Sequence, residues 1–266
     1  MANLQSLSSA VLDNAKQCIN YKNWLHFVTF ICAISSIFMS GELLYVSAVI
    51  ALLSEFVSWL LSLSVNNKKS LGQELIRLNI LQSAFGSSMK VDVAYLKSKV
   101  SKNEYKKASE FDTEAYYATS DADSEKRLVD IIQESCFWSQ HLYYACKKKS
   151  IAVSIFLGVV IVVLIVTGLA IIDTDNNYSL PRLSLLFLMF FPLWNSVENA
   201  ISYGSGSAKL SSIDQQLNKG SYDLPNILAL FADYNVVTSN TPLIPQSVYE
   251  SEKEKLSELW AERCVK

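Results

Sequence analysis

Residues 151–172 form an apolar stretch without a single charge (IAVSIFLGVVIVVLIVTGLAII), and this stretch limits the folds open to the chain more than any other feature. An α-helix rises 1.5 Å per residue, so about 20 apolar residues cross the hydrocarbon core of a bilayer. A fully buried helix of a soluble protein is the alternative, but such a helix is rarely this long and this apolar. The stretch therefore predicts a transmembrane helix.

Three further apolar runs accompany it, and two of them each contain one acidic residue. They span residues 24–39, residues 43–65 with Glu55, and residues 183–201 with Glu198 near the end. Short turns at residues 40–42 and 173–182 pair the four runs into two hairpins. We therefore expect an all-α membrane protein with four transmembrane helices in two hairpins, a helical cytoplasmic insert and a helical C-terminal tail.

The lysines and arginines lie on one side of this arrangement. The first turn has no basic residue, and the second has only Arg182. All other basic residues fall in the N-terminal arm, the middle segment and the tail, with Lys68 and Lys69 directly after the second run and residues 147–149 directly before the third. Because basic residues that flank membrane helices are retained in the cytoplasm, both termini are expected there.

This order divides the chain into five segments. They are a cytoplasmic amphipathic helix at residues 1–23, a first transmembrane hairpin at 24–65, a cytoplasmic helical domain at 66–150, a second hairpin at 151–203 and a cytoplasmic tail at 204–266. Stripes of mostly apolar residues at 71–85 and 128–145 adjoin the second and third membrane runs. We expect these two membrane helices to continue into the cytoplasm and to pack against each other there.

The N-terminal segment shows a helical pattern of its own. Apolar residues recur at helical spacing at Leu4, Leu7, Val11, Ala15 and Cys18. This pattern suits either a helix that lies on the membrane or a helix that packs on the cytoplasmic domain.

The remaining cytoplasmic segments also predict helices. Residues 91–107 predict one lysine-rich helix, and the tail predicts two helices, at residues 225–234 and 248–264, with an extended connection at 241–245. Residues 203–209 (YGSGSAK) lack the glycine-to-lysine spacing of a phosphate-binding loop. They predict either a flexible exit from the membrane or a weak point in a continuing helix.

No catalytic or cofactor-binding motif is present in the sequence. It has no Rossmann glycine pattern, no Walker loop, no nucleophile elbow and no set of His, Cys and Asp at metal-ligand spacing. Asp121, Asp123 and Glu125 resemble part of a calcium loop, but the following glycine and the distal glutamate are missing. The five cysteines form no CxxC pair, and no disulfide is expected in the cytoplasm or the bilayer. We therefore expect no enzyme, no cofactor and no metal site.

Polar residues inside the membrane runs carry the main functional signal, because charges there are costly and usually face the bundle interior or water. Measured from the outer ends of their helices at 1.5 Å per residue, Glu55 lies about 18 Å deep and Glu198 about 22 Å deep, which is a similar level. The candidate residues are Ser54, Glu55, Ser58, Asn195, Glu198 and Asn199.

These residues have two interpretations. They can line a hydrated path with an acidic ring, as in cation-selective pores. They can also hold membrane helices together through small and polar contacts. Glu55 can instead pair with His26, which lies near the cytoplasmic end of the first membrane helix. One four-helix chain is too small to enclose a wide channel, so a pore implies a homo-oligomer.

A second candidate site is the lysine-rich helix of the cytoplasmic domain. Its basic residues are Lys97, Lys99, Lys102, Lys106 and Lys107. Such a cluster can bind anionic lipid heads or a phosphate-bearing ligand. The alternative is a solvated helix face without a ligand.

The order of segments and two local motifs resemble a known family. The motifs are residues 131–139 (IIQESCFWS), shortly before the third membrane run, and residues 242–249 (PLIPQSVY) in the tail. With its hairpin, helical insert, second hairpin and soluble tail, the chain resembles the SMODS-associated four-transmembrane effectors of bacterial anti-phage defence operons. It resembles the two-helix SLATT proteins more distantly.

This resemblance implies a dormant pore-forming effector of the bacterial inner membrane, which damages the membrane when infection is sensed and so causes abortive infection. It also implies a homo-oligomer, and a cyclic oligonucleotide or a partner defence protein as the signal. Two other functions remain open, an ion channel or transporter and a membrane-anchored interaction scaffold. A net charge of -2 gives no reason to expect a nucleic-acid polymer as partner.

Overall fold

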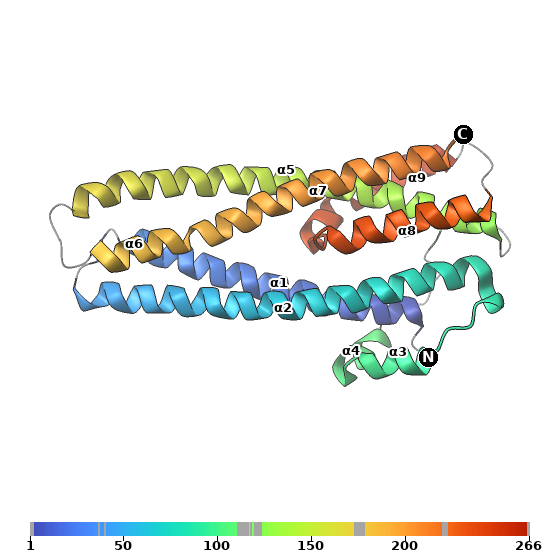
Figure 1. Cartoon of the computed structure of the whole chain (residues 1–266), viewed down its shortest axis with the longest axis horizontal. Coiled ribbons are helices and arrows are strands. Elements are labelled where there is room, and N and C mark those ends of the chain that lie inside the picture. Colours follow the sequence, from blue (N-terminus) through green and yellow to red (C-terminus); the bar gives the residue numbers. More distant parts are fainter. Residues whose placement is uncertain are drawn as a thin grey trace. The chain divides into compact units, whose positions relative to one another are not determined.

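The computed structural model describes residues 3–36, 38–39, 41–110, 117, 119, 124–172, 179–219 and 223–264, and every regular element in these ranges is helical (Figure 1). The elements are α1 (Leu4–Ser35), α2 (Glu42–Phe85), a 3-10 turn η1 (Gly86–Ser88), α3 (Val93–Lys99), α4 (Lys102–Ala108), α5 (Glu125–Ile172), α6 (Ser179–Leu188), α7 (Phe190–Leu217), α8 (Leu224–Asn240) and α9 (Gln246–Cys264). The expected all-α fold is confirmed. The acids at positions 121 and 123, and most of the turn at 173–182, lie outside the described residues.

Three helical stretches are long and apolar enough to cross a membrane: Glu42–Phe85, Glu125–Thr167 and Leu180–Leu217. Their large apolar side chains face outward; on α5, Val159, Val162 and Val166 are 59%, 60% and 64% exposed. The apolar part of α1 begins only at Trp24, and α1 ends at Ser35, which is shorter than the roughly 20 residues that a bilayer requires. The structure thus supports a membrane-embedded protein with three apolar helices of sufficient length.

The described helices belong to two compact units. We call the first the membrane unit (Gln17–Val65 and Lys148–Ala200) and the second the extramembrane unit (Met1–Lys16, Asn66–Lys147 and Ile201–Lys266). The helices α1, α2, α5 and α7 each contribute residues to both units.

The core of the membrane unit combines residues from both predicted hairpins. Its members are Cys32 and Ala33 of α1, Leu44 and Ala51 of α2, Ile161 and Leu164 of α5, and Leu185, Leu188 and Met189 around the end of α6. The buried Arg182 adds a polar contact, because its Nη2 donates a hydrogen bond of 3.2 Å to the carbonyl oxygen of Met39. This arginine therefore links α6 to the segment between α1 and α2.

The main core of the extramembrane unit joins the end of α2 to the beginning of α5. Ile80 and Ala84 of α2 share a buried cluster with Leu128, Ile131 and Ile132 of α5, and residues of α7, α8 and α9 complete it. The backbone N–H of Ser124 also donates to the carbonyl of Ala84, at 3.0 Å. The expectation that the extensions of the second and third membrane helices pack against each other is confirmed.

The first turns of α1 pack inside the extramembrane unit. Leu4, Leu7 and Val11 are buried in a second cluster with Leu75 of α2 and Leu96 of α3. Of the two expectations for this segment, the packing helix is therefore the one that the structure shows. The helix does not stop at residue 23, since α1 continues to Ser35.

The expectation of one helix at residues 91–107 is wrong, because the chain forms the two short helices α3 and α4. Val100 between them is extended, with ψ 136°. The hydroxyl of Ser101 accepts a hydrogen bond from the backbone N–H of Glu104, and the Glu104 carboxylate accepts one from the backbone N–H of Ser101. This reciprocal capping box starts a new helix at Lys102 and so ends the previous one.

The fourth apolar run is also interrupted, at Met189 between α6 and α7. Pro192 lies in the first turn of α7, where its missing N–H leaves the carbonyl of Leu188 without its usual helical partner. The helical run is therefore interrupted at Met189, just before this proline.

The glycines of residues 203–209 serve close packing inside α7, which continues through them to Leu217. A Cβ atom added to Gly206 would lie 2.5 Å from Oγ1 of Thr241 and 3.2 Å from Cδ2 of Tyr143. The hydroxyl of Tyr203 donates 2.7 Å to the carbonyl of Leu243. The absence of side chains at Gly206 thus lets the extended connection between α8 and α9 lie directly on α7.

We expect Gly206→Ala to destabilise the protein by about 1–3 kcal/mol, the usual cost of overpacking a tight contact. Thermal unfolding of the detergent-solubilised chain measures this loss. Gly158→Ala is the matched control, because an added Cβ meets nothing within 4 Å there. Equal melting temperatures for the two variants would contradict the packing role of Gly206.

Candidate functional site

The membrane unit contains a polar cluster centred on His26 of α1. Nδ1 of His26 lies 3.0 Å from Oε1 of Glu55 on α2. Nε2 lies 3.3 Å from Oγ of Ser58, also on α2, and 3.4 Å from Nδ2 of Asn195 on α7. Three helices therefore bring their polar side chains together at one imidazole.

Helical spacing places the α2 members of this cluster correctly. Glu55 and Ser58 are three residues apart and so share one face of the helix. The side chains of His26 and Glu55 are only 13% and 10% exposed. A carboxylate in such a setting needs a partner, since an unpaired charge among apolar helices is costly. Nδ1 of His26 supplies this partner, and Nε2 of the same ring remains for the hydroxyl of Ser58 and the side-chain amide of Asn195.

The two predicted carboxylates differ in their surroundings. Glu198 of α7 is exposed and makes no hydrogen bond to the cluster in the part of the chain that the structure describes. Lys22 of α1 interacts electrostatically with both Glu55 and Glu198. The two acids are therefore related through a shared positive charge. Asn199 is half-buried and Ser54 is buried, and neither bonds to His26.

The structure thus brings together Glu55, Ser58 and Asn195 from the predicted set. Sequence reasoning placed His26 only as a partner of Glu55, and it missed Lys22. The signal in the sequence is that His26 lies inside an apolar run, one helical turn after Lys22. This pattern indicates a polar group of α1 within the membrane unit.

The same face of α2 also forms helix contacts. Ser47, Ala51, Ser54 and Ser58 follow one another at spacings of four, three and four, and all are buried. Small residues at such spacings let helices approach closely in a bilayer. Ser58 belongs to both this packing face and the His26 cluster, so the two interpretations of the polar residues coexist at this position.

The five lysines of the second candidate site do not converge on one point. Nζ of Lys99 lies 3.2 Å from Glu74 and 4.5 Å from the ring centre of Tyr95. Lys97 lies over the ring of Tyr105, at 5.5 Å. Lys107 pairs with Asp13 of α1.

The other two lysines, Lys102 and Lys106, are exposed on α4. Three of the five lysines thus already have protein partners, and anion or lipid binding at this helix pair stays a prediction.

A buried ionic contact near these lysines centres on Glu104 of α4, which is 5% exposed. Its Oε1 accepts 2.6 Å from Nζ of Lys68 on α2 and 2.7 Å from Nδ2 of Asn14 on α1. Burial alone would raise the pKa of this carboxyl, but the hydrogen bonds from Lys68, Ser101 and Asn14 outweigh burial and lower it. Glu104 of α4 is therefore ionised, and its carboxylate bonds to residues of both α1 and α2.

We expect Glu104→Gln to destabilise the extramembrane unit by about 2 kcal/mol, because Lys68 then keeps a half-buried charge without a counterion. Urea or thermal unfolding measures the change. Glu110→Gln, which removes the same charge from an exposed position just after α4, is the control and should leave stability unchanged.

The same contact predicts a pH dependence. Because the pKa of Glu104 is lowered in the folded state, its stabilisation is complete above the ordinary glutamate pKa of about 4.3 and is lost as the pH falls below it. The melting temperature of the wild type should therefore fall more steeply than that of Glu104→Gln in this acidic range. Parallel pH profiles would show that the carboxylate does not contribute.

Within the residues that the structure describes, no group of three His, Cys, Asp or Glu side chains could hold a metal ion. The five cysteines are all free, and Cys32, Cys136 and Cys146 are buried.

The two motifs that carry the family resemblance meet in the extramembrane unit. Trp138, from the segment 131–139, lies 6.4 Å from Tyr249, from the segment 242–249, between ring centres. Both rings border a small cluster of Phe137, Leu142 and Leu256. The two motifs are thus parts of one packing interface between α5 and α9.

Comparison of the chain with models of known protein families, with curated proteins and with solved structures finds no match.

Proposed function

We propose that the protein is a membrane effector that assembles as a homo-oligomer and makes the bacterial inner membrane permeable to ions when activated. The observation that carries the proposal is the cluster of His26, Glu55, Ser58 and Asn195 inside a unit whose outer surface is apolar. Ionisable groups at such positions are rarely retained for packing alone, and they commonly mark ion or proton paths. The family resemblance supports the same function and adds the context of anti-phage defence.

The topology that we propose has four spans with both termini in the cytoplasm. The three long apolar helices supply three of them, and the apolar part of α1, followed by the turn before Glu42, supplies the fourth. Lys68 and Lys69 on α2 and residues 147–149 on α5 then lie on the cytoplasmic side.

The pairing of Glu55 suggests how such a pore stays closed. In the single chain the Glu55 carboxylate is paired with His26 and largely buried between helices, so it offers no free charge to a passing cation. In an open assembly we propose that α1 and α2 shift, so that Glu55 leaves His26 and faces a hydrated path shared by several copies. A signal such as a cyclic oligonucleotide or a partner defence protein acts by binding the extramembrane unit better in the open state.

The test measures membrane potential and growth in cells that express the chain. We expect His26→Leu to increase depolarisation relative to the wild type by roughly tenfold, the effect of about 1.4 kcal/mol, because Glu55 loses the partner that holds it in the closed state. Glu55→Leu should abolish depolarisation, and the double variant should behave as Glu55→Leu does.

Equal membrane abundance of all variants is required. Ser62→Ala is the control, since the hydroxyl of Ser62 donates to the carbonyl of Ser58 in its own helix. Glu198→Leu reports separately on the exposed acid. Identical depolarisation by wild type, His26→Leu and Glu55→Leu would remove the cluster from the mechanism. If neither the wild type nor the His26→Leu variant depolarises the membrane, the result favours a membrane-anchored interaction scaffold.

A further inference from the structure

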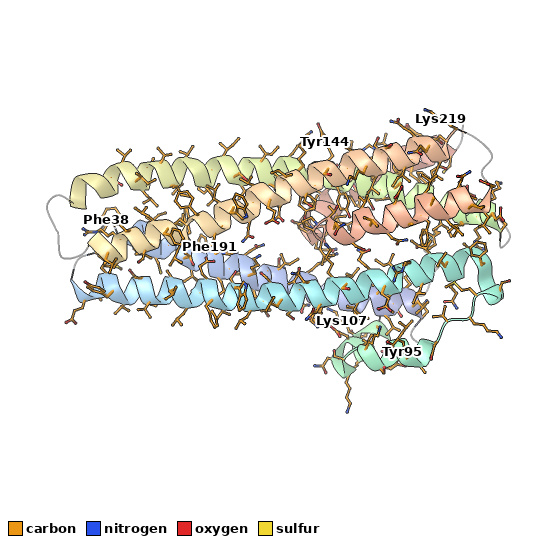
Figure 2. The ribbon with its side chains drawn as sticks, viewed as in Figure 1. Phe38, Tyr95, Lys107, Tyr144, Phe191 and Lys219 are labelled. Carbon is orange, nitrogen blue, oxygen red and sulfur yellow. The ribbon has the colours of Figure 1, made fainter. Side chains whose placement is uncertain are left out.

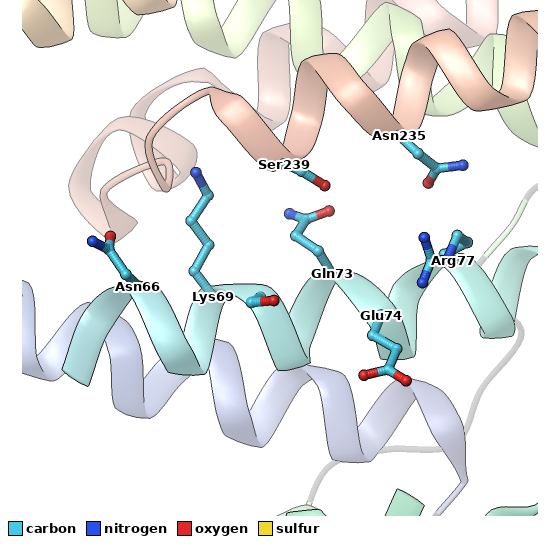
Figure 3. Close-up of a pocket in the computed structure, with 8 residues that line it drawn as sticks. Asn66, Lys69, Gln73, Glu74, Arg77, Asn235 and Ser239 are labelled. Atoms are coloured by element: carbon cyan, nitrogen blue, oxygen red, sulfur yellow. The ribbon is translucent and has the colours of Figure 1, made fainter. Parts of the chain in front are cut away.

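The extramembrane unit contains a polar pocket of about 330 Å³ between α2 and α8 (Figure 3). Its lining residues are Asn66, Lys69, Ser70, Gln73, Glu74 and Arg77 of α2 and Asn235 and Ser239 of α8. The volume lies at the lower end of the range for small-molecule sites. All of these side chains are polar or charged, which is unusual for the space between two packed helices.

Helical spacing gathers the α2 groups on one side. Asn66, Lys69, Gln73 and Arg77 follow one another at spacings of three, four and four, and therefore share one helix face. Figure 3 shows Lys69, Gln73 and Arg77 on the side of α2 that faces α8, with Glu74 pointing away.

The charge of the pocket is positive. Both carboxylate oxygens of Glu74 accept from Nζ of Lys99, at 3.2 Å, so this acid is already neutralised by a residue outside the pocket. Lys69 and Arg77 have no carboxylate within salt-bridge distance among the residues that the structure describes. Two cations thus face a small, partly open pocket without a protein anion, and such an arrangement attracts an anionic ligand.

The neutral groups add a second requirement. Nδ2 of Asn235 donates 2.7 Å to the carbonyl of Phe231, which leaves its Oδ1 as an acceptor. Gln73 and Ser239 can both donate and accept hydrogen bonds. A ligand that satisfies the pocket therefore has anionic oxygens for Lys69 and Arg77, and hydroxyl groups that donate to the amide and hydroxyl oxygens. The ionised oxygens of a phosphate group meet only the first requirement, so an organic part with hydroxyl groups is needed to meet both at separate positions.

We propose that this pocket binds a phosphate ester whose organic part carries hydroxyl groups. The arginine can bind phosphate oxygens through paired N–H groups, and the lysine contributes a compact positive charge. Such an ester can be a soluble molecule, for example a nucleotide or sugar phosphate, or the glycerol phosphate head of a lipid, since Asn66 directly follows the apolar run of α2. The site stands independently of the proposed pore.

Isothermal titration calorimetry on the full chain in detergent micelles tests the proposal. The soluble probe is ADP, the lipid probe is dihexanoyl phosphatidylglycerol below its micellar concentration, and inorganic phosphate is the comparison. The variant is Lys69→Gln with Arg77→Gln. The matched control is Lys253→Gln with Lys255→Gln, which removes the same charge from exposed lysines of α9 in the same unit.

We expect saturable binding of ADP or of the short-chain lipid to the wild type and to the control, and weaker binding of inorganic phosphate. The Lys69→Gln/Arg77→Gln variant should bind at least about tenfold more weakly, the effect of losing charge-assisted hydrogen bonds. Preference for ADP identifies a soluble ligand, and preference for the lipid identifies a headgroup. The proposal is overturned if neither ester binds, or if the variant, with an unchanged melting temperature, binds as tightly as the control.

Discussion

The structure depends on one constraint, that the backbone of an apolar segment in hydrocarbon must satisfy its own hydrogen bonds. Helices meet this requirement, and α2 and α5 remain unbroken well beyond their apolar runs. The same two helices then supply much of the extramembrane core, through Ile80 and Ala84 on one side and Leu128 and Ile131 on the other. These long helices thus carry exposed apolar side chains, such as Val49 and Val159, along one part and a conventional buried core along the other. Side chains over the whole chain, among them Phe191 of α7, are drawn in Figure 2.

A polar cluster inside such a unit requires compensation from its neighbours. Small residues on α2, among them Ala51 and Ser54, bring the helices close enough for His26 to reach Glu55 and for Asn195 to reach His26. The imidazole of His26 offsets the cost of burying the Glu55 carboxylate. The hydroxyl of Ser58 and the side-chain amide of Asn195 offset the cost of burying the imidazole. Close packing and polar pairing are therefore two aspects of one arrangement. A change that separates α1 from α2 would affect both.

The sequence was sufficient for those features that depend on local composition. The apolar runs, the tail helices α8 and α9 and the extended segment before Pro245 follow from charge, periodicity and proline alone. The break between α3 and α4 also has a signal in the sequence, namely Ser101 with Glu104 three residues later, which is the pattern of a capping box. The lysines at helical spacing on both sides of it favour one continuous helix instead. The anchoring of Glu104 by Asn14 and Lys68 and the pocket between α2 and α8 join residues far apart in the chain, so no local pattern could predict them.

The position of α1 explains why its apolar part can be short. His26 lies within that part, and Lys22 just before it interacts with the acids of α2 and α7. A helix with these groups gains little from lipid alone, so its place in the membrane unit depends on its partners. In addition, α1 begins in the extramembrane unit, where Leu7 and Val11 are fully buried and Asn14 bonds to Glu104. Of the four predicted spans, α1 is therefore the one whose position is set most by contacts rather than by hydrophobicity.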